Sequence, residues 1–176
     1  MVPAILILTF AWSLKGMTDS LGAKYFVRDF VYQNASNFQS FLPAIVFIIG
    51  CLLAFATGTS WGTFGMLIPI VQNVFPMDNP LAVVCISACM AGAVCGDHCS
   101  PISDPTIMAS AGAQCDHVNH VSTQLPYAIT VAAVSFVSYL IAGFVPKAYI
   151  SLPIALVLML LTIFVLHRTL KGKAAA

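Results

Sequence analysis

Residues 81–113 read LAVVCISACMAGAVCGDHCSPISDPTIMASAGA, an apolar run with a polar, proline-containing centre from Gly96 to Thr106. Residues 41–75, FLPAIVFIIGCLLAFATGTSWGTFGMLIPIVQNVF, share this plan, with a glycine- and hydroxyl-rich patch from Thr57 to Gly65. A single helix over residues 41–75 would be about 52 Å long, whereas a bilayer core is roughly 30 Å thick. Both units are therefore predicted to break or turn at their centres, where glycine and proline weaken a helix.

The composition of the chain is that of a membrane protein. Of its 176 residues, 60% are hydrophobic and 7% are charged, against roughly 25% charged in a soluble domain. A lipid-facing exterior can be as apolar as the interior, whereas a small soluble domain needs a polar surface. We expect an all-α, polytopic membrane helix bundle with two interrupted (broken or re-entrant) helices. The net charge of +1 gives no electrostatic footprint for nucleic acid.

Two conventional spans, Leu125 to Val145 and Tyr149 to Leu166, follow the interrupted units after a polar connection from Gln114 to Gln124. The first apolar run, Val2 to Leu14, is shorter than the 20 or so residues that a span needs. We expect it to lie at the interface, or, as we favour, to be the end of a span whose first half precedes this chain. Residues 1–176 then form one transmembrane transporter domain, the carboxyl-terminal part of a longer protein. A polar loop runs from Lys15 to Ser40.

Small residues recur every four positions in the second unit, at Ala88, Gly92 and Gly96. Such a face lets another helix approach closely. The six cysteines lie mostly within apolar runs, where a free cysteine behaves as a small hydrophobe. We therefore expect close helix packing here and no disulfide framework.

Two aspartates, Asp97 and Asp104, are embedded in the second interrupted unit, and no lysine or arginine occurs between Arg28 and Lys147. A carboxylate at bilayer depth costs about 2.5 to 3.5 kcal/mol on insertion scales. Protonation, a bound cation, a water-filled cavity or a partner from other helices could compensate this cost. Exchange of sodium for protons would use the first two in turn at one site.

Sodium is a hard cation and prefers several oxygen ligands. Broken helices supply free backbone carbonyls, and Pro101 and Pro105 are predicted to unwind the chain beside both aspartates. We expect a sodium and proton site at Asp97 and Asp104, with no cofactor besides the transported ions. The glycine-rich patch could equally be a helix-packing seam. The hydroxyl groups expected to contribute to the site are those of Thr57, Thr59, Ser60, Thr63, Ser100, Ser103 and Thr106.

A second polar cluster contains Asp116, His117 and His120, with Cys115 beside it and His98 earlier in the chain. Its spacing fits no established zinc pattern, so we expect a polar interfacial loop and no transition metal. Histidine titrates near neutral pH. His98, Asp116, His117 and His120 are therefore candidates for modulating a response to pH.

Five stretches closely resemble the NhaC-type sodium/proton antiporters: FAWSL (10–14), ATGTSWGTFG (56–65), GDHCSPISD (96–104), CDHVNHV (115–121) and TQLPY (123–127). The resemblance implies a multi-pass antiporter of the plasma (inner) membrane whose broken helices meet near mid-membrane. It also implies helices upstream of this region, or a partner half, and homo-oligomers are compatible with it. Pro105 stands where threonine is expected in relatives.

Other functions compete with sodium/proton exchange. Some similar proteins exchange organic acids such as malate and lactate, which would require a basic or dipolar anchor for the carboxylate. Intramembrane aspartyl proteases also place two aspartates among apolar helices, but Val94 stands where their signature needs glycine, so an enzyme is not expected. A purely structural membrane subunit is the last alternative.

Overall fold

The computed structural model describes residues 39–75 and 78–174 continuously, together with scattered residues among the first 29. The apolar run from Val2 to Leu14 and most of the polar loop from Lys15 to Ser40 fall outside the described residues, so their predicted roles stay predictions. From residue 39 onward, every regular element in the described part of the chain is helical. The all-α prediction is therefore confirmed.

A short 3-10 helix, η1 (Gln39–Phe41), precedes the first long helix. The α helices are α3 (Leu42–Thr57), α4 (Ser60–Val74), α5 (Pro80–Cys99), α6 (Asp104–Gly112), α7 (His117–Phe144) and α8 (Ala148–Ala174). Four segments in the described part are long and apolar enough to cross a membrane: Gln39–Thr57, Pro80–Cys99, His117–Phe144 and Ala148–Thr169. At 1.5 Å per residue α4 is only about 22 Å long, which is shorter than a bilayer core.

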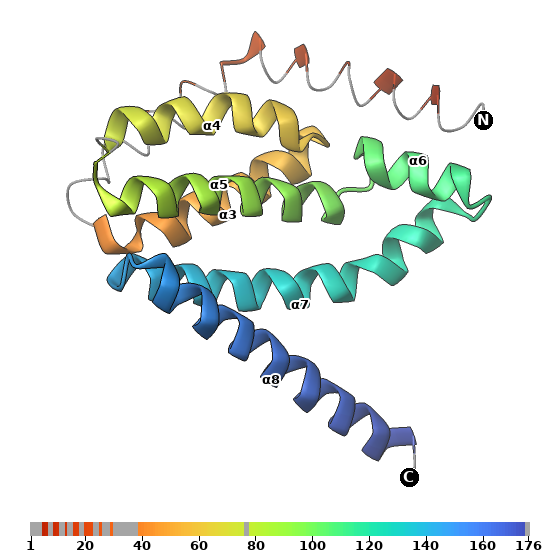
Figure 1. Cartoon of the computed structure of the whole chain (residues 1–176). Coiled ribbons are helices and arrows are strands. Elements are labelled where there is room, and N and C mark those ends of the chain that lie inside the picture. Colours follow the sequence, from red (N-terminus) through yellow and green to blue (C-terminus); the bar gives the residue numbers. More distant parts are fainter. Residues whose placement is uncertain are drawn as a thin grey trace.

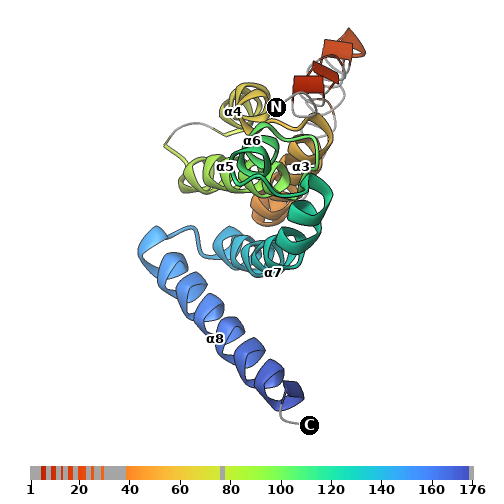
Figure 2. The ribbon, with the colours of Figure 1, turned by 90° about the vertical axis from the view of Figure 1, so that its right-hand side faces the viewer.

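Helices α3 and α5 form the centre of the bundle, with α4 on one side of them and α7 on the other (Figures 1 and 2). Helix α8 contacts α7 near its own start and then leads away from the bundle (Figure 1). An apolar core fills the space between the start of α3, the end of α4 and the start of α5. Its buried residues are Leu42, Val46, Leu67, Ile70, Val71, Phe75, Ala82, Cys85 and Cys89.

The predicted face of small residues on α5 packs directly on α3. A Cβ atom added to Gly92 would overlap the carbonyl oxygen of Phe47, and one added to Gly96 would overlap that of Cys51. On the opposing helix, a Cβ atom on Gly50 would lie 3.1 Å from the backbone nitrogen of Ala93. The prediction of a close helix approach is confirmed, because these backbones leave no room for a side chain between them.

We expect Gly92→Ala to lower stability by about 1 to 3 kcal/mol, the usual cost of forcing an extra methyl group into a packed contact. Thermal unfolding of the purified protein in detergent would measure the loss. Gly65→Ala is the matched control, since Gly65 is also helical but has no neighbouring atom within 4 Å of an added Cβ. That variant should gain about 0.5 to 1 kcal/mol from helix propensity. Equal stability of the two variants would contradict the proposed packing.

In both units two helices are separated by a short non-helical segment, shorter than the sequence predicts; that these are interrupted or re-entrant helices of a membrane span stays a prediction. In the first unit only Gly58 and Thr59 lie between α3 and α4, whereas Gly62 and Gly65 are helical and Pro69 lies inside α4. The chain reverses direction at this break, so that α4 runs back along the α3–α5 pair (Figure 1). Gly58 therefore makes the turn without help from the other glycines.

The second break comprises Ser100 to Ser103, and the preceding residues from Gly96 to Cys99 still belong to α5. The prediction that Pro105 unwinds the chain beside Asp104 is wrong. Pro105 lies in the first turn of α6, where a missing N–H breaks no helical hydrogen bond. The position of either break within a bilayer stays a prediction.

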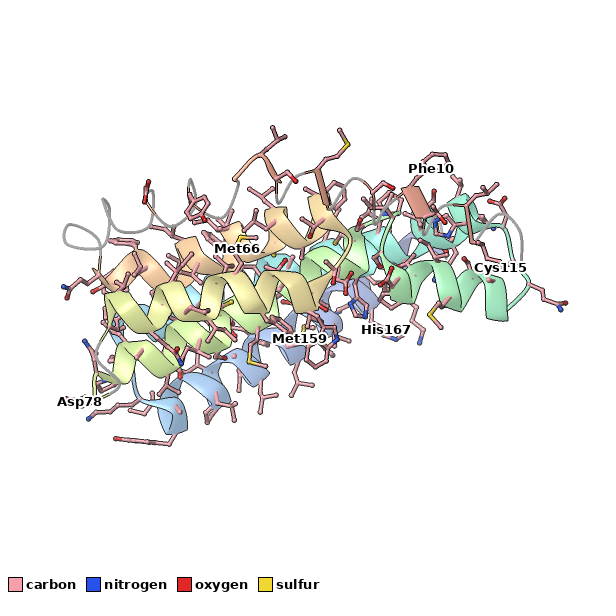
Figure 3. All side chains as sticks on the ribbon, turned by 90° about the horizontal axis from the view of Figure 1, so that it is seen from above. Phe10, Met66, Asp78, Cys115, Met159 and His167 are labelled. Carbon is pink, nitrogen blue, oxygen red and sulfur yellow. The ribbon has the colours of Figure 1, made fainter. Side chains whose placement is uncertain are left out.

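Helix α7 begins eight residues before the predicted span, so most of the stretch from Gln114 to Gln124 is helical rather than a loop. The reason is a helix cap, in which the Oδ1 atom of Asp116 accepts a hydrogen bond from the backbone N–H of Asn119 at 2.8 Å. Figure 3 shows Cys115, just before this cap, at the opposite end of the molecule from Asp78. The two connections α4–α5 and α6–α7 therefore lie at opposite ends of the bundle.

Candidate functional site

Buried polar side chains gather at the end of the bundle where both breaks lie. They come from the last turn of α3, the first turns of α4, the last turn of α5, the second break and α6. The apolar core occupies the opposite end of α3, α4 and α5. This division places a polar centre inside an otherwise apolar molecule. Its members are Thr57, Ser60, Thr63, Asp97, Ser100, Ser103, Thr106 and Ser110.

The first break is a left-handed turn at Gly58, whose φ is 66°. Its N–H donates to the carbonyl oxygen of Ala54 at 2.8 Å and ends α3. Thr59 caps α4, with its Oγ1 accepting from the N–H of Gly62 at 3.5 Å. Because a left-handed residue with a Cβ atom is disfavoured, glycine suits this turn.

The second break is capped on both sides. The N–H of Ser100 donates to the carbonyl oxygen of Asp97 at 3.1 Å, which closes the end of α5. The Oγ of Ser103 accepts from the N–H of Thr106 at 3.3 Å and donates to the Oγ1 of that threonine at 2.9 Å. These bonds define a four-residue connection whose hydroxyl groups point inward rather than into solvent, since Ser100 and Ser103 are fully buried.

The two breaks contact one another. The Oγ of Ser100 donates a hydrogen bond to the carbonyl oxygen of Phe55, in the last turn of α3, at 2.8 Å. A Cβ atom added to Gly58 would lie 2.6 Å from the carbonyl oxygen of Ile102. The α3–α4 and α5–α6 junctions therefore lie side by side, as Figure 1 also shows. The two polar patches of the sequence form one site.

Asp97 is the most unusual group in this site. It lies in the last turn of α5 with 5% of its surface exposed. Its Oδ1 atom has no hydrogen-bond partner among the residues that the structure describes. Burying a charged oxygen without a partner is costly. This oxygen is therefore open to a further partner, such as a proton or a cation.

Asp104 is in a different situation. It is half-buried in the first turn of α6, and it is not without a partner. The amino-terminal end of a helix stabilises a carboxylate by about 0.3 to 1 kcal/mol. The charge of Asp104 thus has a structural explanation that Asp97 lacks. The sequence treats the two aspartates alike, whereas the fold distinguishes them.

The hydroxyl groups expected around the site are present at this end of the bundle, and all but the half-buried Thr59 are buried. Several already donate their hydrogen to the protein: the Oγ1 of Thr57 to the carbonyl of Leu53 at 2.7 Å, and that of Thr63 to the carbonyl of Thr59 at 3.0 Å. A hydroxyl oxygen that donates in this way keeps lone pairs for other partners. Such oxygens suit a hard cation.

The four candidates for a pH response occupy different positions. The exposed side chain of Asp116 caps α7, and His120 is half-buried. His98 is exposed, with its Nδ1 atom 2.9 Å from the carbonyl oxygen of Val94. His117 is hydrogen-bonded through both ring nitrogens, to Ser110 and Pro101.

No group of three or more histidine, cysteine or acidic side chains in the described segments could hold a metal ion. The expectation that the protein has no transition-metal site stays a prediction, as does a role of the four candidates in pH sensing. Sodium needs no such cluster, because hydroxyl and carbonyl oxygens also serve as its ligands.

Sequence reasoning missed two participants in this end of the bundle. Ser110 is buried in the last turn of α6 and contacts His117, seven residues later. The carbonyl oxygen of Phe55 anchors Ser100 from 45 positions away. No motif marks either one, since Ser110 lies between alanines and Phe55 contributes only backbone.

Comparison with known proteins identifies relatives over most of the chain. The family model described as "Na+/H+ antiporter family" matches residues 1–144, which confirms the resemblance to this class of antiporter. An uncharacterized protein of Haemophilus influenzae is 48% identical over 80% of the chain. A malate-2H(+)/Na(+)-lactate antiporter of Bacillus subtilis is 31% identical over 76% of the chain, and an uncharacterized Na(+)/H(+) antiporter of Haemophilus influenzae is 32% identical over 76%.

The chain spans 27% of the length of the first two of these relatives and 29% of the third. No solved structure matches the chain at a significant level.

Proposed function

This chain belongs to the Na+/H+ antiporter family, and we propose that it exchanges sodium for protons across the plasma membrane. Family membership together with four helices able to cross a bilayer makes the chain a membrane protein. A multi-pass topology in the plasma membrane is part of the proposal. We further propose that the protein is a transporter without enzymatic activity or nucleic-acid partner.

The observation that carries this proposal is the buried Oδ1 atom of Asp97, which has no hydrogen-bond partner in the described part of the chain. A proton makes the carboxyl group neutral, and a sodium ion balances its charge. Since both cannot occupy the same oxygen, binding of one favours release of the other. A site with this property couples the movement of sodium to that of protons in the opposite direction.

We propose that the surrounding oxygens complete the sodium shell. The hydroxyl groups of Ser100, Ser103 and Thr106 come from the second break and α6, and those of Thr57, Thr59, Ser60 and Thr63 from the first break and its flanks. Asp104 would add a second carboxylate at the start of α6. Because the Ser100–Phe55 and Gly58–Ile102 contacts join the breaks, both would move together when the site opens.

The proposed transport needs more than the helices described. The relatives are considerably longer than this chain, which covers 27% to 29% of their length. No residue of α8 whose exposure the structure describes is fully buried within the chain. We propose that lipid and further helices, upstream in the same protein or in a partner half, cover these faces and complete the ion pathway. Homo-oligomers are compatible with this arrangement.

The runner-up is sodium- or proton-coupled exchange of organic acids. It is favoured by the relative named as a malate-2H(+)/Na(+)-lactate antiporter, which is 31% identical to this chain. A carboxylate substrate would need an anchor, and the sequence has no lysine or arginine between Arg28 and Lys147. The amino-terminal ends of α4 and α6 would be the available dipolar anchors.

Flux measurements distinguish the two functions. In everted membrane vesicles with the full-length protein, sodium addition should release protons from an acidified interior without any organic acid. Vesicles lacking the protein are the control. If proton movement instead requires malate or lactate, the runner-up is correct and sodium/proton exchange is not.

A further inference from the structure

One imidazole joins the start of α7 to both the second break and α6. The Nε2 atom of His117 lies 2.6 Å from the carbonyl oxygen of Pro101, and its Nδ1 atom lies 2.9 Å from the Oγ of Ser110. His117 is the first residue of α7, Pro101 belongs to the second break, and Ser110 is buried in α6. Movement of the break relative to α7 would therefore disrupt a bond to this ring.

The partners determine the tautomer of the ring. A backbone carbonyl can only accept, so Nε2 carries a hydrogen that it donates to Pro101. In the neutral ring Nδ1 is then a bare acceptor, and the hydroxyl of Ser110 donates to it. In the protonated ring Nδ1 carries a hydrogen as well, and the Oγ of Ser110 accepts it.

The hydroxyl group of Ser110 has a second acceptor for its hydrogen. The carbonyl oxygen of Ile107 lies 2.9 Å from the same Oγ. When His117 takes up a proton, the Ser110 hydroxyl can rotate from Nδ1 to Ile107 without any movement of heavy atoms. Both protonation states of the ring thus keep a full set of hydrogen bonds.

We propose that His117 is a positioning residue that holds the second break against α7 in both protonation states, and that its positive charge weakens sodium binding at Asp97. This inference rests on the proposed function. Pro101, which accepts from the ring, follows Ser100, whose N–H donates to the backbone carbonyl of Asp97, so one short stretch of backbone joins the partner of the ring to Asp97. A nearby positive charge lowers the affinity for a cation. As pH falls, sodium affinity should therefore decline more steeply than competition at Asp97 alone requires.

Both partners of the imidazole are neutral, but the elements packed against α7 carry titratable and charged groups. These groups are Cys51 on α3; Cys85, Cys89, Cys95, Asp97, His98 and Cys99 on α5; Asp104 on α6; and Tyr149, His167, Arg168 and Lys171 on α8. Beside it in the chain are Cys115, Asp116 and His120. Since these groups titrate too, the test must isolate the charge of His117 by substitution.

The transport test compares two substitutions of His117 in proteoliposomes containing the full-length protein. His117→Ala removes the bond to Pro101 and should lower exchange at every pH. Glutamine can still donate to Pro101 but carries no charge, so His117→Gln should recover most of that loss at alkaline pH. Histidine titrates between about pH 8 and pH 5. Over this range the half-saturating sodium concentration of His117→Gln should rise roughly tenfold less than that of the wild type. His167→Gln, exposed on α8, is the control. Identical pH profiles for His117→Gln and the wild type would overturn the charge effect.

An NMR test does not depend on transport. In protein with nitrogen-15-labelled histidine, the ring signals of His117 are those that disappear in His117→Gln. At alkaline pH they should show a protonated Nε2 and a bare Nδ1, and at acidic pH two protonated nitrogens. Ser110→Ala should lower the proton affinity of the His117 ring about fivefold. The reason is that the bond from the charged ring to the Ser110 oxygen is stronger than the bond from the Ser110 hydroxyl to the neutral ring, and the substitution removes both. Ser122→Ala removes an exposed hydroxyl bond within α7 and should change nothing. A neutral ring protonated on Nδ1 would overturn the inference, whereas failed transport with the expected NMR signals would count against the proposed function.

Discussion

Replacement of Asp97 by asparagine is expected to reduce sodium-induced proton movement to the background of vesicles that lack the protein. Asparagine has nearly the same shape as aspartate, but its side chain carries no negative charge and does not take up a proton near neutral pH. The substitution therefore removes the exchange of ions without altering the packing at the end of α5. Fluorescence of a pH-sensitive dye in everted vesicles would measure the loss.

Folding and function can be separated in this variant. Because Asp97 has a buried oxygen without a partner among the described residues, Asp97→Asn should unfold at the same temperature as the wild type or higher. Asp78→Asn is the control, since Asp78 is exposed in the connection between α4 and α5, and it should transport normally. Wild-type proton movement in well-expressed Asp97→Asn would refute the assignment of the site.

Gly58→Ala is expected to lower transport strongly, by separating the two breaks. The left-handed conformation, with φ of 66°, costs a residue with a side chain roughly 1 to 2 kcal/mol. In addition, the new Cβ would lie 2.6 Å from the carbonyl oxygen of Ile102, so one of the breaks must shift. The initial rate of sodium-induced proton movement, normalised to protein amount, would measure the effect.

A second substitution identifies which of the two causes matters. Asparagine tolerates the left-handed conformation better than alanine, but its Cβ meets Ile102 in the same way. If contact between the breaks positions the site, Gly58→Asn should transport as poorly as Gly58→Ala. Recovery in Gly58→Asn would show instead that only the backbone angle is important. Gly112→Ala, at a helical position with no atom within 4 Å of an added Cβ, should be close to wild type.

Much of the site could be predicted because its residues are close together in the sequence. The polar residues from Gly96 to Thr106 interrupt an apolar run, and the helix does break there, at Ser100 to Ser103. The predicted widths of the breaks were too large, because glycine and proline are tolerated inside or at the start of helices. Pro105 shows this most clearly: its type predicts unwinding, but its position in the first turn of α6 makes it harmless.

The difference between the two aspartates could not have been read from the chain. Asp97 and Asp104 have the same chemistry and similar neighbours. Yet, within the described segments, Asp97 is left with a buried oxygen that lacks a partner, whereas Asp104 begins a helix. Similarly, nothing near Ser110 reveals that it faces His117 across the α6–α7 connection. These properties depend on which helix end lies opposite each side chain.

By itself, the sequence determined that this protein resides in a membrane, that it is helical, and that two polar patches interrupt its apolar runs. Hydrophobicity, helix breaking and capping act within a few neighbouring residues, so the order of amino acids suffices for them. Only the tertiary structure decided that the two patches form one site, through Ser100 and Phe55, which are 45 positions apart, and through Gly58 and Ile102. Such contacts depend on how α3 and α5 pack, since the absence of side chains at Gly92 and Gly96 brings their backbones together.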